Sequence, residues 1–245
     1  MRRLRDIVYF DTSFDEFNTR FYGINFSEFL KVSPRKFNNI LLLNSEYWRG
    51  EYNQNTSLYY LKNDQFEKFI EDDEYSIGDF CWIDFKESSE LDTLKPQELA
   101  ELLYLGHKQC PLNISFFERL NNFYCYCGHD DGWRTKLYCK VKTDISEIIS
   151  NTVTLNLESF KRRRIYEINT EVKEELLKLS RGGLLIDFSD LVTDRNLISI
   201  PFYVIGKDLN MDDMYNNQEK LKYNAQIKGY LKQKNREWSL SEKSW

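Results

Sequence analysis

The sequence predicts an α+β fold with a mixed or mainly antiparallel sheet and interleaved helices. Short stretches rich in β-branched and aromatic residues alternate with amphipathic stretches of helical period. These segments do not follow the strict strand–helix–strand rhythm of a parallel α/β fold. No internal repeat is visible in the 245 residues. We therefore expect a single domain spanning residues 1–245, with any lobe boundary near residues 145–165.

The chain is expected to open with a strand over residues 4–10, which are β-branched and aromatic. Ser13 and Glu16 then have the spacing of a capping box, which marks the start of a helix. The phenylalanines that follow recur at helical spacing on one apolar stripe. A helix is therefore predicted over residues 13–21.

The remaining elements are predicted from the same two patterns. Strands are expected over residues 38–44, 57–61, 78–85, 122–129, 134–141, 184–189, 197–207, 222–232 and 236–240. Helices are expected over residues 63–72, 95–107, 115–120, 144–150, 170–181 and 210–221. Asn63 and Asn169 are expected to cap helices, and Gly106 is expected to end one.

Composition and charge exclude several classes of function. The chain has 39 acidic and 34 basic residues and a net charge of -5, which argues against a nucleic-acid partner. No run reaches the roughly 18–20 apolar residues of a membrane span. The amphipathic start lacks the apolar core of a signal peptide. Five cysteines, an odd number, fit a reducing compartment. We therefore expect a cytoplasmic protein.

All cysteines and histidines lie within residues 81–139. As a metal pattern, His107, Cys110, Cys127 and His129 are candidate zinc ligands, because zinc prefers four Cys or His ligands. The usual C-x2–4-C spacing is absent, however, and free cysteines often serve as small core residues. We favour core packing and predict no cofactor, with zinc or magnesium as minority alternatives.

A second constellation consists of His129, Asp130 and Asp131. A histidine beside a carboxylate is suited to general base catalysis, and adjacent carboxylates can hold Mg²⁺. His107, at the end of a predicted helix, is a further catalytic candidate. No nucleophile or phosphate-binding motif accompanies them. Asp131 is followed by Gly132, and Asp-Gly is also typical of a hairpin turn. A structural turn is therefore favoured over catalysis.

Three further residues are candidates for partner binding. Arg162 and Arg163 belong to the one dense basic cluster, which is suited to a phosphate, an acidic partner or RNA. In an acidic chain a solvent-exposed turn is the simpler interpretation of this cluster. Together with the acidic run over residues 71–75, it also permits charge-guided docking to a protein. Trp133 adds an aromatic contact beside the predicted hairpin.

Six segments distributed along the chain carry a family resemblance: LRDIVYFDTSFDEFNTRFYG, GDFCWIDF, ELAELLYLGH, HDDGW, IPFYVIG and NMDDMYNN. Over nearly its whole length the chain resembles a family of uncharacterised soluble cytosolic proteins of Bacillus-like bacteria. Some members carry the label oxalate:formate antiporter, which the lack of membrane-length apolar segments rejects. The resemblance implies that aliphatic residues often replace Cys125 and Cys127, which weakens the metal interpretation. It directs attention to His107, His129, Asp130, Asp131 and Trp133.

Two functions of different classes follow as hypotheses. The first is a cytosolic interaction or regulatory protein without catalysis, whose partner is another protein. The second is a small hydrolase-like enzyme that uses His129 with Asp130 or Asp131, together with His107 and a divalent metal. The first is favoured because catalytic motifs are missing. The sequence predicts neither a substrate nor an oligomeric state.

Overall fold

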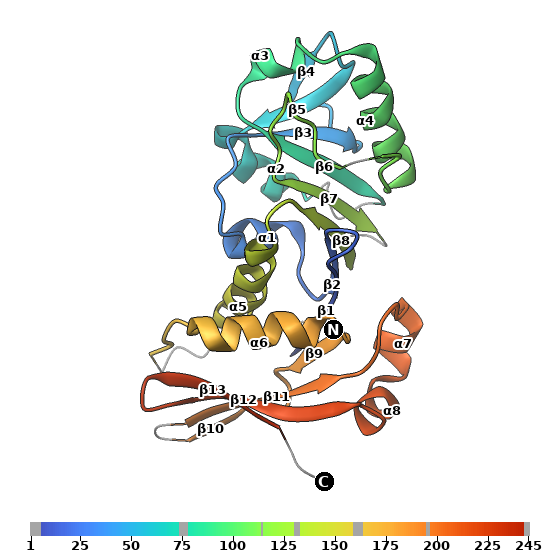
Figure 1. The fold of residues 1–245 in the computed structure, drawn as a ribbon. Coiled ribbons are helices and arrows are strands. Elements are labelled where there is room, and N and C mark those ends of the chain that lie inside the picture. Colours follow the sequence, from blue (N-terminus) through green and yellow to red (C-terminus); the bar gives the residue numbers. More distant parts are fainter. Residues whose placement is uncertain are drawn as a thin grey trace.

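The computed structural model describes residues 6–73, 78–113, 115–129, 133–158, 164–194 and 197–242. In these residues the strands form one sheet that runs the length of the molecule, with helices on both of its faces (Figure 1). Every strand pair of this sheet is antiparallel. The prediction of an α+β fold with a mainly antiparallel sheet is confirmed.

The strand order does not follow the chain order. It is β13-β12-β11-β9-β1-β2-β8-β7-β6-β3-β5-β4, and β10 pairs with β11 beside this path. The strands are β1 (Ile7–Ser13), β2 (Asn18–Tyr22), β3 (Asn39–Asn44), β4 (Glu51–Asn53), β5 (Leu58–Lys62), β6 (Phe80–Phe85), β7 (Tyr124–His129), β8 (Arg134–Cys139), β9 (Leu184–Asp187), β10 (Val192–Asp194), β11 (Leu197–Val204), β12 (Ile227–Lys234) and β13 (Glu237–Glu242). Because β9 pairs with β1, the sheet continues across the boundary expected near residues 145–165.

The helical elements of the described residues are α1 (Phe26–Val32), a 3-10 turn η2 (Asn63–Gln65), α2 (Phe66–Asp72), α3 (Ser88–Leu91), α4 (Pro96–Lys108), α5 (Lys142–Glu158), α6 (Thr170–Ser180), α7 (Met211–Asn216) and α8 (Gln218–Tyr223). Asn169 caps α6 as predicted, because its side chain accepts a hydrogen bond from the Val172 amide. The cap predicted at Asn63 is wrong: this residue begins the 3-10 turn, and α2 starts after Gln65 without a side-chain cap.

The helix predicted over residues 13–21 is also wrong, because β1 and β2 form a hairpin there. Each strand of the hairpin has a second neighbour, β9 on one side and β8 on the other. Pairing on both sides satisfies the backbone groups that a helix would satisfy internally. Phe17, at φ 52, lies in the turn, and the rings of Phe10 and Phe21 pack across the hairpin at 6.1 Å between centroids. Tertiary pairing therefore overrides the helical spacing of the phenylalanines.

Other differences are local. Residues 115–120 form turns instead of the predicted helix, and neither α1 nor β4 was predicted. Gly106 does not end α4, which continues to Lys108 and is capped by Gln109 in the left-handed region. A Cβ atom at Gly106 would lie 2.5 Å from the carbonyl oxygen of Leu43. This glycine therefore permits close packing of α4 on β3.

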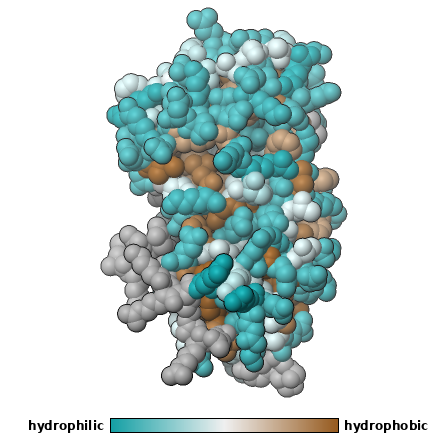
Figure 2. All heavy atoms as spheres, turned by 90° about the vertical axis from the view of Figure 1, so that its left-hand side faces the viewer, coloured by the Kyte–Doolittle hydropathy of each residue, from teal (hydrophilic) through white to brown (hydrophobic). Residues whose placement is uncertain are grey.

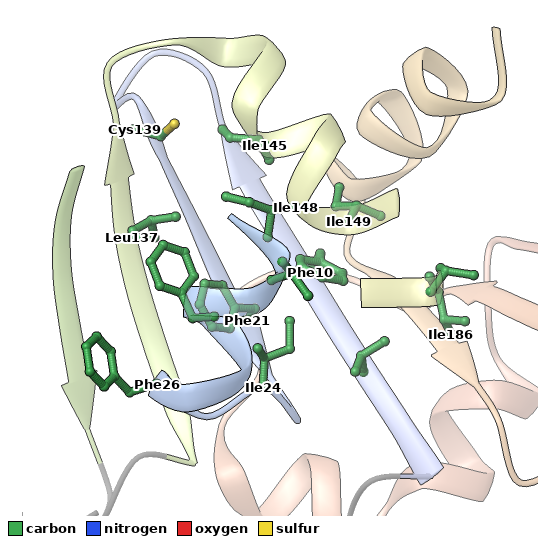
Figure 3. Packing of buried hydrophobic residues seen from close by; sticks show 14 of the residues in the cluster. Phe10, Phe21, Ile24, Phe26, Leu137, Cys139, Ile145, Ile148, Ile149 and Ile186 are labelled. Carbon is green, nitrogen blue, oxygen red and sulfur yellow. The ribbon is translucent and has the colours of Figure 1, made fainter. Parts of the chain in front are cut away.

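The two faces of the sheet are named here after the helices that cover them. The α5 face is covered by α1, α5 and α6 over a large aromatic core, and Figure 3 shows Phe10, Phe21 and Leu137 beside the isoleucines of α5. The α4 face is covered by α4 at one end and by α7 toward the other, each over a smaller hydrophobic cluster. Since side chains alternate along a strand, each strand contributes to both faces.

The outer surface of α1, α5 and α6 is mainly hydrophilic. Figure 2 looks onto this side of the molecule and shows only limited hydrophobic areas between polar side chains. No helix in the described part of the chain is long and apolar enough to span a membrane.

Candidate functional site

The site residues predicted from the sequence lie in different surroundings. His129 is the last residue of β7, and its Nδ1 atom lies 3.7 Å from a carboxylate oxygen of Asp79. His107 is exposed in the last turn of α4. Trp133, directly before β8, is 43% exposed. Asp130, Asp131, Arg162 and Arg163 lie outside the described residues.

The cysteines group differently from the predicted metal pattern. Among the described residues, one set of three or more metal-ligating side chains has its ligand atoms within 4.8 Å of one another, namely Cys81, Cys125 and Cys127. Cys127 thus belongs to a group with Cys81 and Cys125, and neither histidine belongs to this group. Cys110, which follows α4, is exposed.

Strand register places ionisable side chains in a row across the α4 face. Asp11 of β1 pairs with Arg20 of β2, and Arg20 pairs with Lys136 of β8. Lys136 in turn pairs with Cys127 of β7, which pairs with Cys81 of β6. One straight row therefore brings a carboxylate, two cations and two thiols onto the same face of five adjacent strands.

A second row runs beside the first. Tyr22 of β2 pairs with Arg134 of β8, and Arg134 pairs with His129 of β7. Residues two positions apart in a strand share a face, so Arg134 and His129 lie beside Lys136 and Cys127. The polar strip, as used below, consists of Asp11, Arg20, His129, Arg134 and Lys136.

Charge in the polar strip is only partly balanced. Arg20 forms ion pairs with Asp208 and, at 3.7 Å, with Asp11, whereas the Lys136 ammonium lies 3.9 Å from Glu16. Arg20 and Lys136 are directly opposite, and like charges in such positions destabilise a sheet. The Nε atom of Arg134 is buried, and no described residue forms a hydrogen bond with it. The strip therefore combines repulsion between cations with an unsatisfied guanidinium donor.

Burial shifts two titrations in the strip. Burial lowers the pKa of Lys136 below its usual value; Glu16 opposes this shift and Arg20 adds to it. Burial also raises the pKa of Asp11, against the pull of Lys207 and Arg20. Both shifts disfavour the charged forms, as expected where side chains are withdrawn from water. An added anion would favour the charged form of Lys136.

The segment before α7 is held against the strip by hydrogen bonds. The Tyr9 hydroxyl donates to the Gly206 carbonyl at 2.6 Å, and the Tyr22 hydroxyl donates to the Leu209 carbonyl at 2.6 Å. The Asp208 amide donates to the Asp11 carboxylate at 3.1 Å. These contacts fix one border of the strip.

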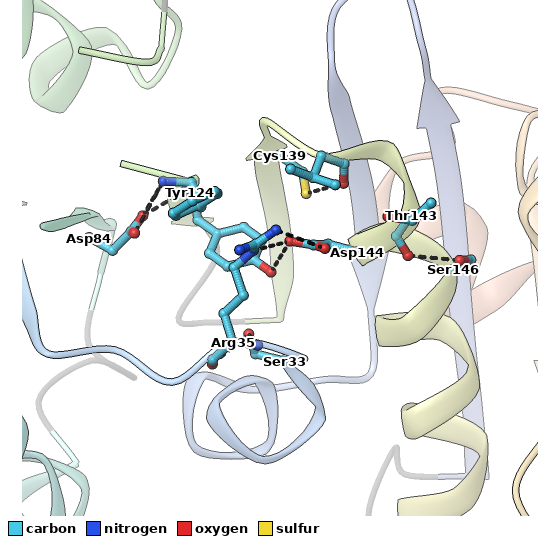
Figure 4. A network of polar contacts seen from close by, with 10 residues as sticks. Ser33, Arg35, Asp84, Tyr124, Cys139, Thr143, Asp144 and Ser146 are labelled. Carbon is cyan, nitrogen blue, oxygen red and sulfur yellow. Dashed lines mark hydrogen bonds and ion pairs between the residues drawn. The ribbon is translucent and has the colours of Figure 1, made fainter. Parts of the chain in front are cut away.

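A separate polar network lies on the α5 face and is shown in Figure 4. The Asp144 carboxylate, in the first turn of α5, accepts hydrogen bonds from the Arg35 guanidinium and, at 2.8 Å, from the Tyr124 hydroxyl. The Arg35 guanidinium also lies 3.8 Å from the centre of the Phe123 ring. Asp84 accepts hydrogen bonds from the amides of Phe123 and Tyr124. The carboxylates of this network have partners, so it joins β6, β7 and α5 structurally.

Sequence reasoning missed most of the strip. Arg20 was assigned to a helix, and the strand neighbours of Lys136 were not predicted. A signal was nevertheless present for one pair. Once the β7–β8 hairpin is predicted with a four-residue connection, counting back from it places Lys136 opposite Cys127. Pairing of this hairpin with β2 has no such local signal.

Comparison with known proteins adds no family. No protein-family model, no curated protein and no solved structure matches this chain. The polar strip and the thiols beside it are therefore the features from which a function can be inferred.

Proposed function

We propose that this protein is an interaction or regulatory protein without catalysis, which binds an acidic segment of a partner protein on the polar strip. The observation that carries the proposal is the direct pairing of Arg20 with Lys136, with Arg134 in the adjacent row. Opposed cations cost stability in the free protein. A partner carboxylate placed between them would relieve the repulsion and accept charge-assisted hydrogen bonds.

Neighbouring residues support a protein as the partner. Trp133 is 43% exposed and immediately precedes Arg134. Tryptophan and arginine are enriched among residues that contribute most to protein–protein binding. The strip also contains Asp11, and the whole chain carries a net charge of -5. These negative charges disfavour a continuous polyanion such as a nucleic acid more than a short acidic segment.

Cysteine chemistry supports the expected location. All five cysteines are free thiols, including the exposed Cys110. Structural disulfides are rare in a reducing compartment. We therefore propose a cytoplasmic protein.

The proposal is tested with a defined probe, a fluorescently labelled hexaglutamate peptide, measured by anisotropy at low and at physiological salt. The wild-type chain is expected to bind, and binding should weaken with salt. Lys136→Met and Arg134→Met should each reduce the affinity by roughly tenfold, the order expected for one lost charge-assisted hydrogen bond. Lys178→Met, at an exposed position of α6, is the matched control and should bind as the wild type does.

Affinity purification from the native cell, followed by mass spectrometry, extends this test to the natural partner. A partner that is captured by the wild type and by Lys178→Met, but lost with Arg134→Met, supports the proposal. Equal capture by all three chains, or equal loss of peptide binding in the control, contradicts it.

The alternative, a hydrolase-like enzyme, is favoured by one specific observation. His129 lies 3.7 Å from the Asp79 carboxylate, and such a pair is suited to general base catalysis. Of the other catalytic candidates, His107 lies on α4, and Asp130 and Asp131 are outside the described residues. A screen with p-nitrophenyl esters and phosphates tests this alternative. Turnover that is lost in His129→Asn would favour it, and turnover that persists would exclude His129 as the base.

A further inference from the structure

Three thiols meet at the end of the first row on the α4 face. Cys81 and Cys127 are direct partners across β6 and β7, and their sulfur atoms are 3.5 Å apart. The sulfur of Cys125 lies 3.7 Å from that of Cys127. All three side chains are fully buried. The sulfur atoms thus form a compact group inside the hydrophobic cluster under α4.

This spacing matches that of sulfur ligands around one metal ion. With metal–sulfur bonds of about 2.3 Å, neighbouring sulfur atoms in a tetrahedral or trigonal site lie roughly 3.8–4.0 Å apart. Side chains at positions i and i+2 of a strand start about 6.6 Å apart at the backbone. Cys125 and Cys127 therefore direct their sulfur atoms toward each other, and small shifts would complete a metal-sized triangle with Cys81.

The Cys127 sulfur lies between the other two sulfur atoms of the group. It is within hydrogen-bond distance of the Cys81 and Cys125 sulfurs, and either atom of each pair can be the donor. Cysteine binds metal ions as the thiolate. Binding of a metal ion would therefore release the thiol protons of the group to solvent.

Tyr138 is a neighbour of the group in the sheet. Tyr138 pairs with Cys125 across β7 and β8, and its side chain points to the same face. Its hydroxyl group is buried and has no hydrogen-bond partner among the described residues. A buried hydroxyl of this kind costs free energy unless something in the neighbourhood satisfies it.

Ligand number and type select the cation. The group offers three sulfur ligands, and no fourth Cys, His, Asp or Glu of the described residues joins it. Zinc prefers four ligands. Soft sulfur ligands select thiophilic ions, among which Cu(I) accepts low coordination numbers. Lys136, opposite Cys127, offsets part of the negative charge that three thiolates bring.

We propose that Cys81, Cys125 and Cys127 form a three-coordinate site for one thiophilic cation, with Cu(I) preferred over Zn²⁺. The proposal does not rest on the docking function, because none of the three cysteines belongs to the polar strip.

The test is an anaerobic titration of the reduced, metal-free full chain with Cu(I), in competition with bicinchoninate. One Cu(I) per chain should resist the chelator and produce an ultraviolet thiolate-to-copper absorption band. Cys127→Val and Cys81→Val should each weaken binding more than about 100-fold, since changes to groups that merely orient ligands already cost about 10–100-fold. Cys139→Val, buried on the α5 face, and Cys110→Ser, exposed after α4, are the matched controls and should bind as the wild type does.

Three results would overturn the proposal. The first is equal Cu(I) affinity in the wild type and Cys127→Val, which would indicate a packed thiol cluster only. The second is binding that follows Cys110 instead. The third is a higher affinity of the chain for Zn²⁺ than for Cu(I), measured in a parallel competition titration. Should a valine variant fail to fold by circular dichroism, copper X-ray absorption of the loaded wild type decides, because the site requires three sulfur neighbours at about 2.2–2.3 Å.

Discussion

On the α5 face the buried polar groups around Asp144 have hydrogen-bond partners. On the α4 face three buried groups have none in the described part of the chain, namely the Arg134 Nε atom, the Tyr138 hydroxyl and the side-chain amide of Gln109. Both faces belong to the same strands, and successive residues of a strand point to opposite faces. The α5 face also carries most of the aromatic core, with α1, α5 and α6 packed on it. The α4 face instead carries opposed cations between its two smaller clusters and grouped thiols within one of them.

This difference separates a structural face from a functional one. Buried polar groups in stable cores are normally satisfied, and exceptions concentrate where a protein binds something. The α5 face follows this rule, with Trp82 Nε1 as an exception among its described residues. The α4 face departs from it at Arg134 and Tyr138 of β8 and at Gln109, which follows α4. Removing a polar group of the network around Asp144 should therefore cost stability, whereas removing a cation of the polar strip should not.

The largest effect is expected from Asp144→Ala on the α5 face. Loss of this carboxylate leaves the Arg35 guanidinium and the Tyr124 hydroxyl without their partner. Breaking a buried pair costs about 3–5 kcal/mol, and the lower end is expected because Arg35 is 32% exposed. Urea unfolding measures the change. Glu175→Ala, which removes an exposed pair with Lys178, is the control and should cost less than about 1 kcal/mol. Equal effects would refute the structural role.

The next effect concerns pH and Asp84. Burial raises the pKa of Asp84 to about 6, against the hydrogen bonds from the Tyr124 and Phe123 amides. A carboxyl with a raised pKa stabilises the fold fully below the unfolded pKa near 4, and this stability is lost as the pH rises through about 6. The loss amounts to roughly 2–3 kcal/mol.

Asp84→Asn isolates this contribution, because it removes the titration and keeps one oxygen acceptor. The unfolding free energy of the variant, minus that of the wild type, should rise between pH 4 and pH 7. Asp64→Asn, at an exposed position, controls for the loss of a negative charge. A difference that stays flat with pH would show that Asp84 titrates normally.

A smaller loss is expected from Gly106→Ala, which changes how α4 sits on the sheet. The added methyl group would lie 2.5 Å from the Leu43 carbonyl oxygen and would force α4 away from β3. Alanine gains about 1 kcal/mol of helix propensity, so the net loss should be about 1–2 kcal/mol. Thermal unfolding measures it, with Leu103→Ala on the exposed side of α4 as control. An increase in stability would instead show that the space between α4 and β3 accommodates the methyl group.

The smallest effect, and one of opposite sign, is expected from Lys136→Met on the α4 face. The change removes the like-charge contact with Arg20 and the burial cost of the ammonium group. Stability should stay equal or rise by up to about 1 kcal/mol while binding of the acidic peptide falls. Lys178→Met should change neither quantity. A clear loss of stability in Lys136→Met would mean that the strip is a structural network, like the one around Asp144.

Prediction from sequence succeeded where the signal was local. Asn169 caps α6 because an asparagine side chain and an amide three residues later suffice. The strand over residues 134–141 was predicted from β-branched and aromatic content, and β8 lies within it. The prediction failed for residues 13–21, because phenylalanines at helical spacing are compatible with a hairpin once two further strands pair with it.

The candidate site shows the same limit. The sequence gathers His107, Cys110, Cys127 and His129 within a short stretch, but short distance along the chain did not decide which side chains meet. Cys81 reaches Cys127 through the pairing of β6 with β7, across more than forty residues of chain. Asp11 and Arg20 reach the same face through β2 and β8.

By itself, the sequence determined the α+β class, most strands and the cap at Asn169, since each depends on periodicity or on contacts a few residues long. It also determined the lack of a membrane-length apolar run. Only the tertiary structure decided that Arg20 lies opposite Lys136 and that three thiols share one buried position. The reason is physical. Strand pairing is set by distant partners competing for the same backbone hydrogen bonds, and a shift of one residue would move every side chain of the two rows to the other face.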